Sequence, residues 1–251
     1  MTVHRFYIPP DQWNPDHLAL DEAESHHAHD VLRLREGTRV GAFNGQGTEV
    51  TAEISLLTKK EVGLRVLFTQ TTPPPDPLIT LAQAVPKGKN MDLVIQKATE
   101  LGAAEIVPLI SERTVVRVDA AEAHDKQEKW QRIAIEACKQ CGQNHLPRVA
   151  QPVTPNRFFA GKPAHDLLLI AAIEPGARRL KELLEEWRGR NPGKTRPGRV
   201  LVLIGPEGDF TPAEVGAAKS AGCLPMSLGP IILRTETAAI YSLSALAHEL
   251  F

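Results

Sequence analysis

Two segments near the C-terminal end combine glycines with charged residues in a pattern that suits ligand chemistry. The first, LVLIGPEGDF at 201–210, runs from an apolar stretch into a glycine-rich turn that carries Glu207 and Asp209. Such a turn after a buried strand often cradles phosphate, but the spacing of a dinucleotide fingerprint and the lysine of a phosphate loop are both missing. Two carboxylates would also repel a phosphate. The turn therefore favours an uncharged or cationic ligand, the alternative being a plain strand-to-helix turn.

The second segment, SLGPIILRTETAAIYSL at 227–243, places an apolar wall beside polar residues. The wall at 231–233 directly precedes Arg234. Thr235 is expected to cap the last helix, and Glu236 in its first turn would complement the helix dipole. Apolar residues next to arginine, threonine and glutamate indicate a binding site. The alternative is an ion pair between Arg234 and Glu236 at the surface.

Cysteines and histidines give weaker indications. The chain has three cysteines, too few for a disulfide framework. Cys138 and Cys141 suggest zinc or redox chemistry, but a single pair at helical spacing is more often packing. His26, His27 and His29 lack cysteine or carboxylate ligands at metal spacing, so a helix end without metal is favoured. We expect no metal cofactor.

The composition predicts an ordinary globular protein without a membrane anchor. Of 251 residues, 42% are hydrophobic and 24% charged. The formal net charge of −1 excludes a uniformly basic nucleic-acid coat, so any nucleic acid must be bound through local patches. No apolar run approaches the length of a membrane span, and the N-terminus lacks the apolar region of a signal peptide. A cytoplasmic location is expected.

A proline-rich stretch, TQTTPPPDPL at 69–78, divides the chain. Residues 1–70 read as a small barrel-like β domain, residues 71–77 as a linker, and residues 78–251 as an α/β domain with a parallel sheet. Strands are predicted at 4–8, in a hairpin at 38–54 that turns at Asn44-Gly45, and at 61–68, 78–85, 104–110, 166–173, 199–205 and 222–229. Helices are predicted at 25–37, 89–102, 128–141, 212–222 and 235–251.

Four segments in order carry a resemblance to a known family: QKATELGAAEIVPL, EACKQCGQNHLPRV, IGPEGDFTPAEV and LGPIILRTETAA. They closely resemble the motifs of the ribosomal RNA uridine-N3 methyltransferases of the RsmE type, which belong to the SPOUT class. HDVLRLREG at 29–37 resembles the N-terminal PUA-like barrel of that family. The resemblance implies a SPOUT-type trefoil-knotted parallel-sheet domain preceded by a small PUA-like β-barrel. The chain departs from the family at Asp209, usually a second glycine, and at Gln143, usually an arginine.

The resemblance also implies a reaction and partners. It implies methyl transfer from S-adenosyl-L-methionine to N3 of a uridine in 16S (small-subunit) ribosomal RNA, within an assembled 30S particle. It implies a homodimer formed through the α/β domain, with the last helix (240–250) as a candidate interface or as core. Two alternatives stay open: the same fold acting on another ribosomal or transfer RNA nucleotide, and an RNA-binding assembly factor that has lost catalysis.

The residues that the resemblance implicates fall into three groups. Arg234 would stabilise the uracil anion, and Glu236 or Glu207 would orient it or accept its proton. The cofactor would be bound by Ala172, Ile204, Gly205, Pro206, Glu207, Gly208, Leu228, Gly229, Ile232, Leu233, Arg234, Thr237 and Ala238. RNA would be contacted by Arg33, Arg35, Lys97, Arg113, Arg188, Arg190, Lys194 and Arg196, with Arg117 a further candidate.

Overall fold

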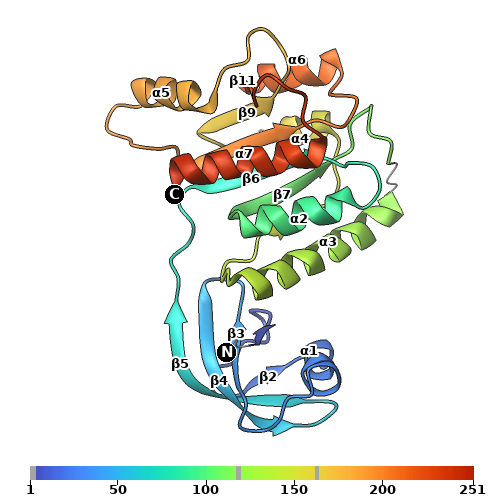
Figure 1. Ribbon diagram of the computed structural model, residues 1–251, viewed down its shortest axis with the longest axis vertical. Helices are drawn as coiled ribbons and strands as arrows, with labels where there is room; N and C mark the ends of the chain where they lie inside the picture. The colour runs from blue at the N-terminus through green and yellow to red at the C-terminus, as the bar shows by residue number, and fades with distance from the viewer. Residues whose placement is uncertain (1–3, 117–119, 162–163) are drawn as a thin grey trace. The chain divides into compact units, whose positions relative to one another are not determined.

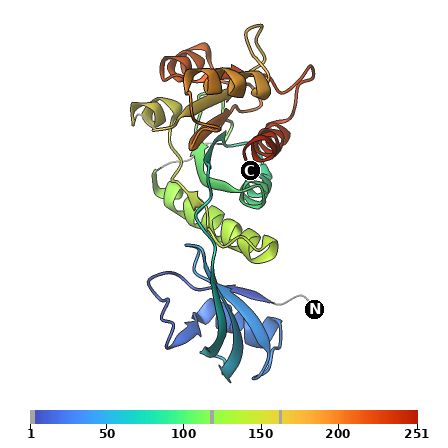
Figure 2. The same cartoon turned by 90° about the vertical axis from the view of Figure 1, so that its left-hand side faces the viewer.

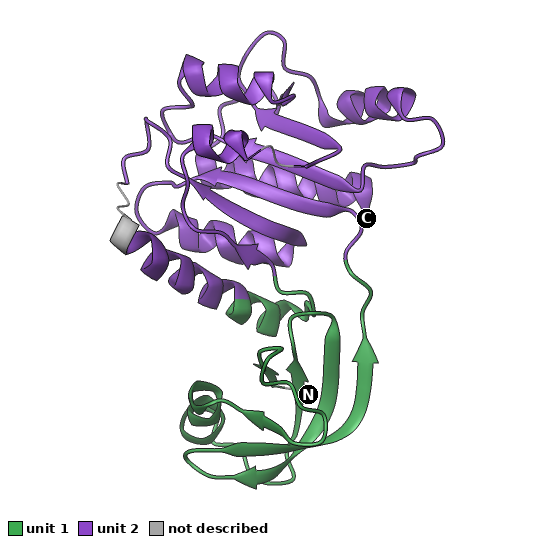
Figure 3. Ribbon diagram, turned by 180° about the vertical axis from the view of Figure 1, so that it is seen from behind, with its two compact units in different colours: residues 1–74, 135–146 green, residues 75–134, 147–251 purple. Residues whose placement is uncertain are grey.

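The computed structural model describes residues 4–116, 120–161 and 164–251. The chain forms two compact units (Figure 3). The first comprises Met1–Pro74 and Ile135–Leu146, and the second Pro75–Ala134 and Pro147–Phe251. The segment 135–146 was placed in the α/β domain on sequence grounds, but in the structure it belongs to the first unit.

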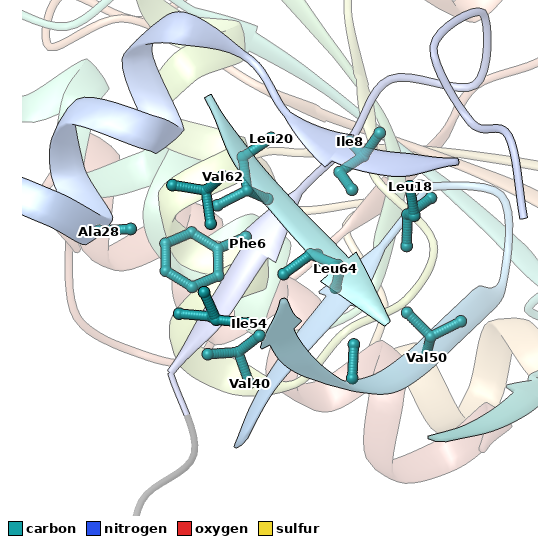
Figure 4. Packing of buried hydrophobic residues seen from close by; sticks show 12 residues of the cluster. Phe6, Ile8, Leu18, Leu20, Ala28, Val40, Val50, Ile54, Val62 and Leu64 are labelled. Carbon is teal, nitrogen blue, oxygen red and sulfur yellow. The ribbon is translucent and has the colours of Figure 1, made fainter. Parts of the chain in front are cut away.

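The first unit is built on a mixed five-stranded sheet in the order β1-β3-β4-β5-β2. The strands are β1 (Arg5–Tyr7), β2 (Leu18–Leu20), β3 (Arg39–Phe43), β4 (Thr48–Leu57) and β5 (Val62–Thr71). The predicted hairpin is confirmed, since β3 and β4 pair antiparallel. Asn44 fixes its turn by accepting hydrogen bonds from the backbone N–H groups of Gln46 and Thr48. Fully buried Phe6 packs among side chains from these strands and Ala28 (Figure 4).

The helical part of the first unit differs from the prediction. The structure has a short helix α1 (Glu22–His26) followed by a π-helix η1 (His27–Val31), and neither reaches Gly37. The helix starts early because the Asp21 side chain caps it by accepting from the Glu24 N–H. It ends early because Arg33 has a φ of 53°, in the left-handed region that a helix cannot include.

Arg5 connects the segment 135–146 to the sheet of the first unit. Its Nε donates to Oε1 of Glu49 at 3.0 Å. Its two terminal nitrogens donate to the carbonyl of Cys138 and to Oδ1 of Asn144. These partners lie far from Arg5 in sequence, which explains why the segment could not be assigned to this unit from local pattern.

Lys139 adds a second connection within the same unit. Its ammonium donates to Glu24 and to Glu136, each at 2.9 Å, and the side chains of Lys139 and Glu24 are only 11% and 12% exposed. Burial raises the pKa of Glu24, and the lysine opposes that rise. Burial alone would lower the pKa of Lys139, but its bonds to the two carboxylates outweigh burial and raise it.

Lys139→Met is expected to destabilise the protein because it leaves the Glu24 carboxylate buried without a cation. Breaking such a pair costs about 3 kcal/mol, whereas Lys129→Met, which removes the exposed partner of Asp92, should cost less than about 1 kcal/mol. Urea denaturation measures both. Since its pKa is raised, the contribution of Lys139 is present below its usual pKa of 10.5 and is lost as pH rises through the folded value. Equal losses in the two variants would contradict this assignment.

The second unit contains a six-stranded sheet in the order β11-β9-β10-β6-β7-β8. All its ladders are parallel, which confirms the predicted α/β class. The strands are β6 (Leu78–Ala84), β7 (Ala103–Leu109), β8 (Arg148–Val149), β9 (Leu167–Ala171), β10 (Arg199–Ile204) and β11 (Leu224–Met226). Residues 200–204 of β10 are all buried, as expected for a strand covered on both faces.

Helices lie on both sides of this sheet (Figures 1 and 2). They are α2 (Asn90–Glu100), α3 (Ala120–Cys141, which contributes to both units), α4 (Pro155–Ala160), α5 (Leu180–Arg190), α6 (Pro212–Ser220) and α7 (Thr235–Leu250). Helices α2 and α7 pack side by side, as do α4 and α6. Neither α4 nor α5 was predicted. No helix in the described ranges is long and apolar enough to cross a membrane.

Candidate active site

A cavity of about 600 Å³ lies at the carboxyl ends of three strands of the second unit. Because β11, β9 and β10 are parallel neighbours, the segments that follow them meet at one edge of the sheet, where open α/β sheets bind ligands. These segments are 171–177, 204–209 and 227–235, and Ala238 of α7 completes the lining.

Most of the predicted cofactor residues lie in this lining. They are Ala172, Ile204, Gly205, Pro206, Glu207, Leu228, Gly229, Ile232, Leu233, Arg234 and Ala238. Gly208 and Thr237 were predicted but lie outside the lining. The lining also contains residues that the prediction did not include: Ala171, Ile173, Glu174, Pro175, Ala177, Asp209, Ser227, Pro230, Ile231 and Thr235.

The turn 205–210 has a defined backbone shape. The N–H of Asp209 donates to the carbonyl of Pro206 at 2.9 Å, and Asp209 has a φ of 59°. This left-handed conformation favours glycine, with aspartate and asparagine next because their short side chains bond locally. Asp209 does so, since its Oδ1 accepts from the Phe210 N–H at 2.7 Å. The position at which the family resemblance implies a glycine is thus one with a positive φ.

Asp209→Gly is expected to leave the fold and its stability within about 1 kcal/mol of the wild type, because relief of the left-handed backbone strain offsets the lost hydrogen bond and the larger backbone entropy that glycine loses on folding. Asp209→Val should cost more, about 2 kcal/mol, since a β-branched residue resists a positive φ. Thermal denaturation of the two variants measures the difference. A valine variant as stable as the glycine variant would show that the turn relaxes to another backbone shape.

Neighbouring segments hold this turn in place. Arg113 donates from Nη1 to the carbonyl of Gly208 at 2.8 Å, and the N–H of Lys87 donates to Oε1 of Glu207 at 2.9 Å. The Thr235 hydroxyl donates to the carbonyl of Gly205 at 3.2 Å. The expectation that Thr235 caps the last helix was wrong: Arg234 occupies the N-cap position without a side-chain bond, and Thr235 instead joins α7 to the turn.

Glu214 is a second anchor, placed behind the turn. It is 4% exposed and forms a capping box with Thr211 at the start of α6. Its Oε2 accepts from the Ser111 hydroxyl at 2.9 Å, and its Oε1 accepts from the Glu112 N–H at 3.0 Å. A single buried carboxylate thereby joins the loop after β7 to the helix that follows the turn.

The remaining walls are apolar and carry open backbone groups. Ile173, Ile231 and Ile232 are 73%, 71% and 80% exposed, so the mouth presents unusually accessible apolar surface. Within the described residues, the backbone N–H groups of Leu228, Ile232 and Leu233 donate to no protein atom. Apolar faces beside unused backbone donors suit a flat heterocycle, which is packed on its faces and bonded at its edge.

The charges in the lining favour a cation over a phosphate. Three carboxylates, Glu174, Glu207 and Asp209, face one guanidinium, that of Arg234. Glu174 is partly neutralised by Lys219 at 2.8 Å. A ligand with positive charge gains from such a lining, whereas a phosphate would be repelled.

Comparison with known proteins agrees with this geometry. The model of the RNA methyltransferase domain matches residues 73–247, and that of the RNA methyltransferase PUA domain matches residues 20–67. The ribosomal RNA small subunit methyltransferase E of Bacillus subtilis is 31% identical over 233 residues, which cover 92% of this chain and 90% of the relative. The chain belongs to the ribosomal RNA small subunit methyltransferase E family.

Solved structures support the assignment. A putative methyltransferase from Legionella pneumophila, in complex with the bound cofactor SAM, has a TM-score of 0.87 at 36% identity, covering 99% of this chain and 98% of that one. The ribosomal RNA small subunit methyltransferase E from Neisseria gonorrhoeae, bound to S-adenosyl methionine, has a TM-score of 0.83 at 32% identity, covering 98% and 97%. The PUA-domain match thus lies within the first unit, and the methyltransferase-domain match covers most of the second unit and the segment 135–146 of the first.

Of the three predicted catalytic residues, Arg234 and Glu207 line the cavity, whereas Glu236 does not. Arg234 is exposed and lies in the cavity lining, as does Glu207. Glu236 is half-buried in the first turn of α7 and lies outside the lining. Within the part of the chain that the structure describes, Arg234 and Glu236 form no ion pair, so the surface-pair alternative does not hold.

The predicted RNA-contacting residues are dispersed. Arg33 and Arg35 are exposed in the PUA-like domain. Lys97, in α2, bonds both oxygens of Glu100 at 2.8 Å. Arg113 is exposed beside the turn. Arg117 lies outside the described residues.

The basic segment 188–199 lies at the opposite edge of the sheet from the cavity, because it leads into the amino end of β10. Of its residues that were expected to contact RNA, Arg188 and Arg190 end helix α5. Three of its arginines already bind groups of the protein. Arg190 pairs with Glu186, and Arg188 donates to the carbonyl of Thr195. Arg196 donates to the carbonyl of Leu250 and pairs with Asp76, whereas Lys194 is exposed.

The cysteines and histidines considered as possible metal or redox groups have contacts that suit packing and helix structure. Cys138 is buried, which raises its pKa to about 12 and makes its thiol unreactive, while Cys141 is exposed. His26 and His29 both contact Asp30. Across the described ranges, no group of three or more histidine, cysteine or acidic side chains could hold a metal ion.

Proposed function

We propose that this protein transfers a methyl group from S-adenosyl-L-methionine to N3 of a specific uridine in 16S ribosomal RNA. The observation that carries the proposal is the cavity, because its walls consist of the two family motifs IGPEGDF and LGPIILRTETAA together with the segment after β9. The proposed substrate is the RNA within an assembled 30S particle in the cytoplasm, as the resemblance implies.

The cavity fits this cofactor by its chemistry. S-adenosylmethionine carries a sulfonium cation, an adenine and no phosphate, and it supplies an electrophilic methyl group that N3 accepts as the carbon–sulfur bond breaks. Three lining carboxylates suit the cation. The open N–H groups of the 228–233 segment and its apolar side chains suit the edge and faces of the adenine.

The protein's own part in the reaction is to hold the uracil and its charge. N3 must lose its proton before it attacks, and the resulting negative charge spreads onto the two flanking carbonyl oxygens. Arg234 lies in the lining, and its guanidinium has no carboxylate partner in the ranges that the structure describes. It stabilises that charge as it develops. Glu207 is better placed than Glu236 to accept the proton, since only Glu207 lies in the lining and one of its oxygens is free of the Lys87 bond.

The proposal includes the homodimer and the trefoil knot that the resemblance implies. Of the two roles considered for the last helix, interface or core, burial favours core, since Leu243, Leu246 and Leu250 are at most 2% exposed within a single chain. Exposed apolar surface on the adjacent helices α2 and α7 comes instead from Leu93 and Tyr241. Sedimentation equilibrium measures the oligomeric state.

The decisive experiment is mass spectrometry of ribosomal RNA from a strain that lacks this gene, before and after the purified protein is added to its small subunits. We expect one 3-methyluridine to be missing and then restored. A deletion that loses no methylated uridine would contradict the assignment, and loss of a methyl group elsewhere would favour the alternative RNA target. Calorimetry with S-adenosylmethionine separates the enzyme from a non-catalytic assembly factor, which need not bind the cofactor.

A further inference from the structure

The loop between β6 and α2 carries two lysines, Lys87 and Lys89, that the reaction described above does not use. Because β6 and β10 are parallel neighbours, this loop and the turn 205–210 leave the sheet at the same edge (Figure 1). They are also in contact, since the N–H of Lys87 donates to Glu207, which lines the cavity. The two lysines therefore lie beside one wall of the candidate active site.

Arg113 brings a third cation to the same place from the loop after β7. Its guanidinium donates to the carbonyl of Gly208 at 2.8 Å. A carbonyl oxygen orients the guanidinium but does not neutralise it, and the side chain is exposed. The cation thus keeps donors free for an external anion.

These three cations lack the carboxylate partners that most others in the second unit have. In the described ranges, no carboxylate oxygen lies within 4.0 Å of the charged nitrogens of Lys87, Lys89 or Arg113. By contrast, carboxylates pair with Lys97, Lys126, Lys129, Arg132, Arg148, Arg178, Arg190, Arg196 and Lys219. Positive charge is therefore left available at this side of the cavity.

At the start of α2, a positively charged residue occupies a position where the helix normally favours a different residue type. Lys89 is the N-cap of α2 and makes no side-chain cap bond, although serine, threonine, aspartate and asparagine are preferred there. A cation at the positive end of a helix dipole is destabilising. Local rules of this kind are broken mainly where function requires it. A bound anion would offset the repulsion.

We infer that Lys87, Lys89 and Arg113 bind backbone phosphates of the substrate RNA next to the nucleotide that enters the cavity. The identity of the RNA rests on the proposed function. The basic segment 188–199 of the same chain is too far away for these contacts, because it lies before the amino end of β10, a strand of six residues that spans roughly 20 Å. The three cations position the RNA backbone, and the cavity selects the base.

The test compares Lys87→Gln/Lys89→Gln with Lys87→Arg/Lys89→Arg, which keeps both charges, and with Lys194→Gln at the opposite edge. Arg113 is left intact because it also anchors the turn. Equilibrium binding of the full chain to unmethylated small subunits is measured over a range of salt concentrations. The glutamine double variant is expected to lower the salt slope by about 1.5, since each lost phosphate contact removes about 0.7 to 0.9. The arginine double variant should keep the wild-type slope.

Affinity for S-adenosylmethionine, measured by calorimetry, should stay unchanged in every variant, since neither lysine lines the cavity. An unchanged slope in the glutamine double variant would overturn the inference, and so would an equal loss caused by Lys194→Gln. Methyl transfer by the wild type is measured in parallel. If the wild type binds RNA through these lysines but transfers no methyl group, the proposed function fails and this inference stands.

Discussion

Arg234→Ala is expected to abolish methyl transfer while leaving S-adenosylmethionine binding nearly intact. Arg234 is exposed, lies in the cavity lining and has no carboxylate partner among the described residues. Its charge is therefore available to the uracil anion that forms when N3 loses its proton. Loss of one donor aimed at a developing anion lowers kcat on the order of 10²- to 10³-fold. Binding should change little, because the expected contribution of Arg234 arises only as the uracil anion develops in the transition state.

Arg179→Ala is the matched control for this variant. Arg179 is the N-cap of α5 and, like Arg234, makes no side-chain cap bond, but it lies outside the cavity lining. Any effect of Arg234→Ala on helix capping or net charge should therefore appear in both variants. Single-turnover transfer and calorimetry measure kcat and cofactor affinity separately. Normal turnover in Arg234→Ala, or an equal loss in Arg179→Ala, would refute the role of Arg234.

Glu214→Ala is expected to weaken both stability and cofactor binding. The carboxylate is buried and accepts from the Ser111 hydroxyl and from the N–H groups of Glu112 and Thr211. Its removal leaves these donors without partners, at a cost of about 3 kcal/mol, which lowers Tm by on the order of 10 °C for a unit of this size. The loop that carries Arg113 would also lose its attachment to α6, so the turn 205–210 would lose one of its anchors.

The exposed neighbour Glu112 supplies the control for this experiment. Glu112→Ala removes a carboxylate from the same loop but leaves the Glu112 N–H bonded to Glu214, so Tm and cofactor affinity should stay near the wild type. Differential scanning fluorimetry with and without S-adenosylmethionine measures both quantities. A Glu214→Ala protein with wild-type Tm would show that water replaces the carboxylate.

The cavity lining could be predicted from sequence because it follows contiguous motifs at the ends of parallel strands. Once β9, β10 and β11 are recognised, their following segments must meet at one edge. Side-chain direction was not predictable at this level. Thr237, in the first turn of α7, lies outside the lining, and Asp209, with its positive φ, lies within it.

Helix α5 has a helical spacing of apolar residues, but the loop-like composition of the segment that follows obscures it. Helix α5 buries Leu180, Leu183, Leu184 and Trp187, which recur at helical spacing. The string that starts at Arg188 is basic and rich in glycine and proline, a composition typical of a loop, which obscures the end of the helix. By contrast, β8 has two residues and β2 has three, too few for any periodicity to show. Strands this short exist because a neighbouring ladder completes their hydrogen bonds.

The discontinuous make-up of the first unit has a consequence for how the chain is synthesised. Arg5 and Glu24 find their partners Asn144 and Lys139 at the far end of α3. While residues up to 74 alone have emerged from the ribosome, Arg5 can bind Glu49 but not Asn144 or the carbonyl of Cys138, and the carboxylate of Glu24 lacks Lys139. The N-terminal unit therefore cannot finish folding first. It is closed only after residues 75–134, the first part of the methyltransferase unit, have been translated, so the two units mature together rather than in order.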